Sequence, residues 1–212
     1  DIGFRQTFKN WRSDGAERRY ATNIRVQDCS FQDIWTTAIS MGGTPDKNRI
    51  LDNIDVLRNH TFNTGIRHKD NSQTPLPAIE ILYPITAEIA GNIVEDSWGS
   101  GLMVFGGTEN IFSAVEIPLT RIFVHHNQTE DTALAVNDYG GMSLWQGGPI
   151  YCYNNNIGNS PGVMPAGITL FRGGPEHALN LSYPLYLDGA YKVYSFNNII
   201  WARSNKKAED PY

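Results

Sequence analysis

A short pattern that recurs along the chain limits the folds that this sequence can adopt. It consists of an apolar residue, two further residues, a Cys or Asn, and then an acidic or amide residue four positions later. The Cys or Asn positions lie 27 to 43 residues apart. The copies are Val26, Cys29, Asp33; Val56, Asn59, Asn63; Ile89, Asn92, Asp96; Val124, Asn127, Asp131; and, more loosely, Tyr151, Asn154 and Tyr194, Asn197. A repeat of variable length is typical of a solenoid whose loops differ while its strands stay in register.

The repeat predicts an all-β fold, namely a right-handed parallel β-helix. No segment sustains the i, i+3, i+4, i+7 apolar spacing of an amphipathic helix, and β-branched residues and glycines interrupt the chain throughout. A β-propeller has a similar period but usually shows stronger hairpin turns. We therefore expect Val26, Val56, Ile89 and Val124 to occupy equivalent core sites in successive coils.

The recurring asparagines are expected to have a structural role. At a bend between two parallel sheets, backbone groups turn away from the strand ladder, and a column of side-chain amides can pair with them and with each other. Asn also tolerates the left-handed backbone that bends require. We therefore interpret Asn59, Asn92, Asn127 and Asn197 as structural residues.

The whole chain, residues 1–212, is predicted to be one β-helix domain that belongs to a longer solenoid. Residues 1–21 form a leading segment, residues 22–204 the coils and residues 205–212 a polar tail. A solenoid end exposes a strand edge and needs a cap, and neither terminus contains an obvious one. We expect further polypeptide, from the parent chain or from a partner, to cover at least one end.

Composition excludes several function classes. The formal net charge is −5 and Lys and Arg do not cluster, which argues against a nucleic-acid partner and mildly against a strongly acidic polysaccharide substrate. No apolar run approaches the length of a membrane span. The two cysteines, Cys29 and Cys152, each lie in an apolar run and are expected to be buried free thiols.

The segment from residue 129 to residue 141 contains the most chemistry-bearing pattern in the chain. Asp131 and Asp138 stand seven residues apart, separated by an apolar strand and followed by a Gly-Gly bend. Glycoside hydrolysis needs two carboxyl groups about 5–5.5 Å apart for retention or about 6.5–9.5 Å apart for inversion. Because seven extended residues span more than about 20 Å, the chain must fold back to bring this pair together. Asp131 also shares the repeat position of Asp33 and Asp96, so a turn-forming role stays open.

Three stretches around these residues resemble glycoside hydrolase family 136, the lacto-N-biosidases of gut bacteria. They are the turn Asp138-Tyr139-Gly140-Gly141, the run 147–155 (GGPIYCYNN) and the run 188–198 (DGAYKVYSFNN). The resemblance covers roughly residues 118–204 and implies a β-helix catalytic domain with Asp131 as acid/base and Asp138 as nucleophile. It also implies an extracellular or cell-surface location and a chaperone-like subunit or fused domain. At 212 residues the chain is shorter than the family's catalytic polypeptide, so it is either a fragment or a smaller relative.

The resulting hypothesis is a glycosidase that releases lacto-N-biose from lacto-N-tetraose-like host oligosaccharides. Trp98, Tyr139, Trp145 and Trp201 are candidates for stacking on sugar rings, although each such aromatic is more often a packing residue. His125 and His126 adjoin on a strand, so one should face inward and one outward. No cofactor is expected; Asp46, Asp70 and Asp96 leave a structural calcium ion open. The alternatives are a β-helix polysaccharide lyase or epimerase with a basic catalytic residue such as Arg172 or Lys192, and a non-catalytic glycan-binding β-helix.

Overall fold

The computed structural model describes residues 19–42, 49–66, 76–106, 121–134, 136, 139–162 and 182–202. These residues form strands joined by short turns, and no helix occurs among them. No segment of the described chain is therefore a helix that could span a membrane. The strands are β1 (Arg19–Gln27), β2 (Ser30–Ile34), β3 (Ile39–Gly42), β4 (Arg49–Leu57), β5 (His60–Thr64), β6 (Ile79–Leu82), β7 (Thr86–Ala90), β8 (Ile93–Ser97), β9 (Leu102–Gly106), β10 (Arg121–His125), β11 (Gln128–Glu130), β12 (Tyr139–Tyr153), β13 (Asn156–Ile157), β14 (Ser182–Phe196) and β15 (Ile199–Ile200).

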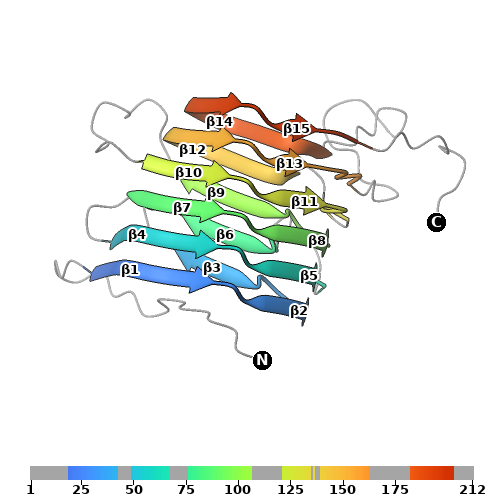
Figure 1. The fold of residues 1–212 in the computed structure, drawn as a ribbon, viewed down its shortest axis with the longest axis horizontal. Coiled ribbons are helices and arrows are strands. Elements are labelled where there is room, and N and C mark those ends of the chain that lie inside the picture. Colours follow the sequence, from blue (N-terminus) through green and yellow to red (C-terminus); the bar gives the residue numbers. More distant parts are fainter. Residues whose placement is uncertain are drawn as a thin grey trace, which may run out of the picture.

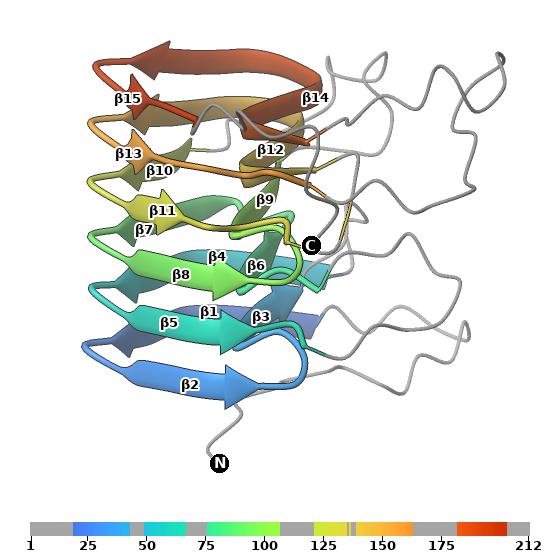
Figure 2. The same ribbon diagram turned by 90° about the vertical axis from the view of Figure 1, so that its right-hand side faces the viewer.

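The strands pair in parallel and form two curled sheets (Figures 1 and 2). The nine-stranded sheet contains two rows that meet in the long strands β12 and β14. Its first row is β1, β4, β7, β10 and the second halves of β12 and β14, and its other row is β3, β6, β9 and the first halves of β12 and β14. The six-stranded sheet runs β2-β5-β8-β11-β13-β15. This all-β arrangement of parallel strands is consistent with a parallel β solenoid.

The predicted core column is confirmed by the strand register. Val26 pairs with Val56, Val56 with Ile89, and Ile89 with Val124. The last three side chains are fully buried, whereas Val26, in the outermost strand, is only half-buried. The column continues through buried Cys152 to Ser195, which is exposed in the last repeat.

A column of amides, which we call the asparagine ladder, lies at the bend between the first row and the six-stranded sheet. The Nδ2 of each member except the last donates to the Oδ1 of the next member and to a backbone carbonyl one repeat back; Asn92, for example, donates to Asn127 and to Val56 O at 2.9 and 2.8 Å. The last member, Asn198, donates to Cys152 O and to Ser195 Oγ. This confirms the structural interpretation of Asn59, Asn92 and Asn127. The ladder consists of Asn59, Asn92, Asn127, Asn155 and Asn198.

Two of the predicted ladder positions are wrong by one residue. Asn154 and Asn197 have φ near +54° and +53° and form the left-handed turn that precedes the ladder, so Asn155 and Asn198 carry the amides. In earlier repeats that turn position holds Asp28, Arg58 or His126. The last residues of the predicted leading segment belong to β1, which begins at Arg19.

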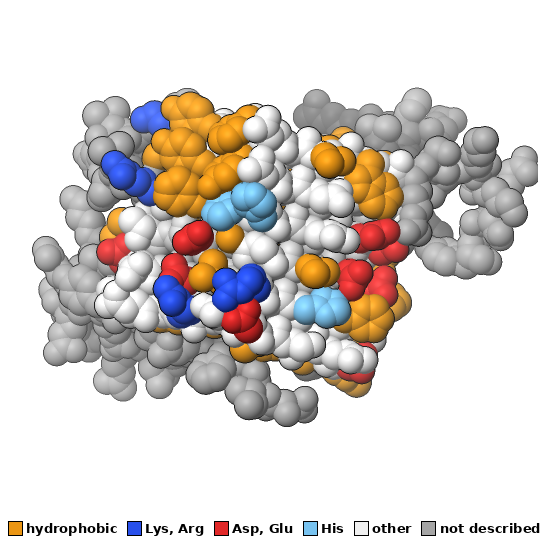
Figure 3. Space-filling model, viewed as in Figure 1, with side chains coloured by type: hydrophobic (Ala, Val, Ile, Leu, Met, Phe, Trp, Pro, Cys, Tyr) orange, Lys and Arg blue, Asp and Glu red, His pale blue; other side chains and the backbone are white. Residues whose placement is uncertain are grey.

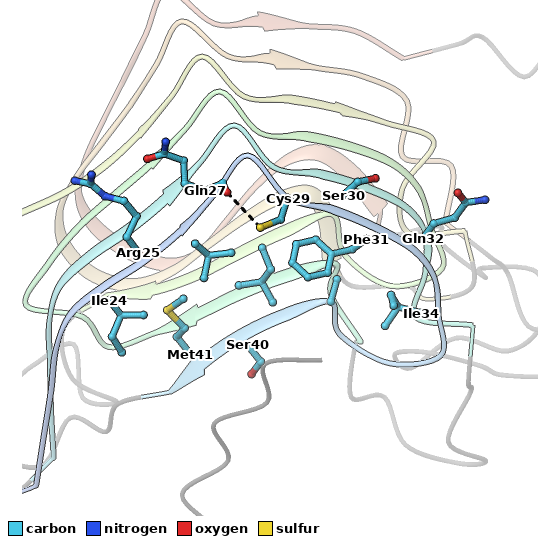
Figure 4. Close-up of a pocket in the computed structure, with 13 residues that line it drawn as sticks. Ile24, Arg25, Gln27, Cys29, Ser30, Phe31, Gln32, Ile34, Ser40 and Met41 are labelled. Atoms are coloured by element: carbon cyan, nitrogen blue, oxygen red, sulfur yellow. Dashed lines mark hydrogen bonds between the residues drawn. The ribbon is translucent and has the colours of Figure 1, made fainter. Parts of the chain in front are cut away.

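The predicted burial of the cysteines is half correct. Cys152 is fully buried and free, and burial raises the pKa of its thiol to about 11. Cys29 is free but exposed, contrary to the prediction. It stands at the ladder position of the first described repeat, where no earlier repeat packs against it among the described residues, and its thiol donates to Gln27 O at 3.2 Å (Figure 4).

Candidate functional site

Acidic and amide residues end the strands of the six-stranded sheet and form a second column, which we call the carboxylate column. Asp33, Asn63, Asp96 and Asp131 have φ values of 55°, 53°, 51° and 49°, a left-handed conformation that Asp and Asn tolerate. Asn159 follows in the next repeat. Asp131 thus occupies the repeat position that its sequence spacing predicted.

Hydrogen bonds divide this column into unlike parts. Asn63 Nδ2 donates to Asp33 Oδ1, and Asn159 Nδ2 donates to Asp131 Oδ1, each at 2.7 Å. Asp96 instead lies between an amide and a carboxylate. Burial raises the pKa of Asp96, and the negative charges of Asp131, Glu95 and Glu130 raise it further.

The neighbouring acidic residues belong to the outer surface of the same sheet. Glu95 and Glu130 are register partners on β8 and β11. His60 Nε2 lies 2.8 Å from Glu95 Oε2, in an exposed ion pair when the imidazole is protonated. Asp96 and Asp131 are therefore two neighbouring carboxyl groups within a larger acidic surface.

One predicted sugar-stacking residue lies beside the carboxylate column. The indole N–H of Trp98 donates to Asn63 Oδ1 at 3.1 Å, and 37% of the residue is exposed. Trp35 occupies the same offset from Asp33 as Trp98 from Asp96 and is 67% exposed, a position that sequence reasoning missed. The sequence contained the signal, because each of these tryptophans follows the acidic position of its repeat by two residues.

The other predicted residues are not gathered at one point. Tyr139 is half-buried at the start of β12, where its carbonyl accepts a hydrogen bond from Ser182. Trp145 packs edge-to-face on Phe105 with ring centroids 4.4 Å apart, in the nine-stranded sheet. The Trp201 indole donates to Asn156 Oδ1 at 3.0 Å in the last repeat. Asp138 lies outside the described residues, and so do Arg172, Asp46 and Asp70.

A surface that sequence reasoning did not identify covers the first row in its last three repeats. Two columns of stacked rings run across β10, β12 and β14, and Figure 3 shows an orange apolar area with pale-blue histidines at its edge. We call them the aromatic field. One column is Phe123, Tyr151 and Tyr194, and the other is His125, Tyr153 and Phe196. The signal in the sequence was the aromatic alternation around residues 123, 151 and 194.

The prediction that His125 and His126 point to opposite faces is wrong. His125 ends β10 on its outer face, stacked on Tyr153 and 3.2 Å from Glu88, and His126 turns outward at φ 54°. Their Nδ1 atoms lie 2.8 Å apart, so one imidazole donates to the other. Burial lowers the pKa of His125, partly offset by Glu88. No group of three or more metal-ligating side chains occurs in the described part of the chain.

A hollow of about 990 Å³ lies at the end of the core formed by the first described repeat. Figure 4 shows Ile24, Phe31 and Met41 among the side chains that line it. Its walls are the inward faces of β1, β2 and β3. A solenoid end of this type is expected to need a cap, as predicted from the sequence.

No family model, no curated protein and no solved structure matches the chain. The resemblance to glycoside hydrolase family 136 therefore rests on its sequence stretches alone.

Proposed function

We propose that the chain is a right-handed parallel β-helix that acts as a glycoside hydrolase on host-type oligosaccharides, releasing lacto-N-biose from lacto-N-tetraose-like glycans. The observation that carries this proposal is the pairing of Asp96 with Asp131 in adjacent repeats. The pKa of Asp96 is raised by burial and by neighbouring carboxylates, and Asp131 accepts a hydrogen bond from Asn159 Nδ2. Unlike environments for two neighbouring carboxyl groups are the usual mark of an acid and a base that work together.

In this mechanism Asp131 protonates the leaving glycosidic oxygen, and Asp138 attacks the anomeric carbon or stabilises the oxocarbenium-like transition state. A general acid must carry its proton near the working pH. Asp131 is among the charges that raise the pKa of Asp96, so the two carboxyl groups are close enough to interact, and the acid role of Asp131 itself comes from the family resemblance. Asp138 enters through the family resemblance, since it lies outside the described residues.

Trp98, Tyr139, Trp145 and Trp201 are the proposed sugar-stacking residues. Trp98 has the best support, because it is exposed and hydrogen-bonded within the carboxylate column. The proposed location is extracellular or cell-surface. The proposed partner is a chaperone-like subunit or fused domain, and the open apolar end formed by β1, β2 and β3 is the surface that such a cover would fit.

The test is product analysis on two substrates, with and without a co-expressed neighbouring protein. The chain should release lacto-N-biose from lacto-N-tetraose. From polygalacturonate it should give no unsaturated product that absorbs in the near ultraviolet. A near-ultraviolet product would indicate the lyase alternative, and no product from either substrate would favour a non-catalytic binder. Azide should restore turnover to Asp138→Asn, because it supplies an external nucleophile, but not to Asp131→Asn.

A further inference from the structure

We propose that the aromatic field is a second, non-catalytic glycan-binding site, and that its ligand carries a carboxylate-bearing sugar. The field lies on the first row of the nine-stranded sheet, whereas the carboxylate column ends the strands of the six-stranded sheet. This inference goes beyond the proposed hydrolysis and does not depend on it.

The ring geometry leaves apolar surface facing outward. Ring centroids within the two columns are 4.8–5.4 Å apart with interplanar angles of 1–22°. Stacked carbon atoms make their best contact at about 3.5–4.0 Å, so rings whose centroids are this far apart stack with a lateral offset. Part of each face stays uncovered, and Phe123, Tyr194 and Phe196 are 37%, 50% and 48% exposed. The apolar C–H face of a sugar ring fits such a surface.

Polar and basic groups border the field on its two sides. On one side, exposed Arg121 and exposed Lys192 directly precede Ile122 and Val193, which both pair with Ile150. On the other side, the exposed turn residues His126, Asn154 and Asn197 offer hydrogen-bonding groups. The surface thus combines ring faces, groups for sugar hydroxyls and cations for an anionic substituent.

The ion pairs of the neighbouring arginines distinguish Arg121 from the other cations on this face. Arg25 and Arg58, on the same face in earlier repeats, are neutralised by Asp55 and Asp28 at 2.7 and 2.8 Å (Figure 3). Arg121 has no acidic partner among the residues that the structure describes. The acidic residue that borders the field, Glu88 on β7, is the register partner of Phe123 and lies 3.2 Å from His125. Salt confines the influence of exposed charges to about 8–10 Å, so Arg121 and Lys192 act on a ligand bound at their own end of the field.

The size of the field favours a sugar over a protein. Two repeat spacings of about 4.8 Å and a two-residue step of about 7 Å along the strands give the ring positions a span of roughly 10 Å by 7 Å. A stable protein interface buries about 800 Å² on each partner. The field supplies only a fraction of that area, whereas a segment of a few sugar units matches it.

The test is calorimetric titration of the full chain with four probes. Sialyllactose and trigalacturonate carry carboxylates, and lactose and α-1,4-galactotriose are their neutral counterparts. At least one carboxylated probe should bind about tenfold or more tightly than its neutral counterpart, a difference of about 1.4 kcal/mol. The proposal would be overturned if each neutral probe bound as tightly as its carboxylated counterpart. It would also be overturned if neither carboxylated probe bound at millimolar concentration.

Variants then locate the binding. Tyr194→Ala with Phe196→Ala should weaken binding at least about tenfold, and Arg121→Gln should abolish the preference for the carboxylated probe. Ile199→Ala is the matched control, because Ile199 is 66% exposed in the same repeat but lies in the other sheet. Thermal denaturation checks that each variant folds. If the ring variant binds like the wild type, the proposal is wrong, whatever the outcome with lacto-N-tetraose.

Discussion

The asparagine ladder and the carboxylate column are built on the same repeats but have opposite characters. In the ladder, Asn59, Asn92 and Asn127 are buried and every amide is used by the next repeat. In the column, Asp33, Asp96 and Asp131 are exposed or half-buried. Both hold the chain at a bend. Only the carboxylate column contains carboxyl groups that solvent and a ligand can reach. Identical amide pairing in every repeat therefore distinguishes the structural ladder, and a mixture of charged and neutral side chains distinguishes the candidate site.

The largest effect on stability should come from breaking the ladder at its centre. Asn92→Ala would remove the acceptor of two donors from Asn59 and the donor to Val56 O. Stranding buried polar groups costs about 1–3 kcal/mol each, with partial relaxation, so we expect a loss of about 3 kcal/mol. Urea denaturation measures it, with Gln32→Ala, an exposed amide on β2, as the control. A midpoint that moves no more than the control's would refute the structural role of the ladder.

A smaller gain is expected where the ladder stops. From Asn59 to Asn155 each ladder amide donates to the next Oδ1, whereas at Cys29 only the backbone N–H does so, to Asn59 Oδ1 at 3.1 Å. Cys29→Asn should add the missing side-chain bond and stabilise the fold by about 0.5–1 kcal/mol. Cys29→Ser, which cannot reach as far, serves as the comparison. Equal stability of the two variants would show that the ladder does not extend into the first repeat.

The smallest stability effect belongs to the carboxylate column. Because the pKa of Asp96 is raised in the folded state, its charged form is less favourable there than in the unfolded chain. Asp96→Asn should therefore stabilise the protein at pH 7. The gain should shrink as pH falls through the raised pKa and vanish below the ordinary value of 3.8. Since the group is partly exposed, we expect only a few tenths of a kcal/mol. Thermal midpoints of both proteins across this pH range would test the sign.

The sequence predicted the core column and the centre of the ladder because both depend on a repeat that is visible in one dimension. It misplaced the ladder at Asn154 and Asn197 because an Asn-Asn pair stands in both repeats, and residue type cannot tell the turn position from the buried one. It could not predict the exposure of Cys29, because that exposure depends on the position of Cys29 in the first described repeat.

The aromatic field was missed for a related reason. Phe123, Tyr151 and Tyr194 become neighbours only through the register of strands joined by loops of unequal length. The repeat itself places Asp96 and Asp131 in adjacent coils. The environments of the two carboxyl groups differ because Asn159, in the following repeat, donates to Asp131.

The central claim is that Asp131 has a chemical role that its repeat position alone does not require. The most direct measurement compares lacto-N-tetraose turnover in Asp131→Asn and Asp33→Asn. The two aspartates share a left-handed turn, and each accepts an amide hydrogen bond at 2.7 Å from the next repeat. The substitution preserves shape in both and removes the ability to shuttle a proton. Asp131→Asn should lower turnover by orders of magnitude while Asp33→Asn retains it; equal turnover in the two variants would show that Asp131 is only a turn residue.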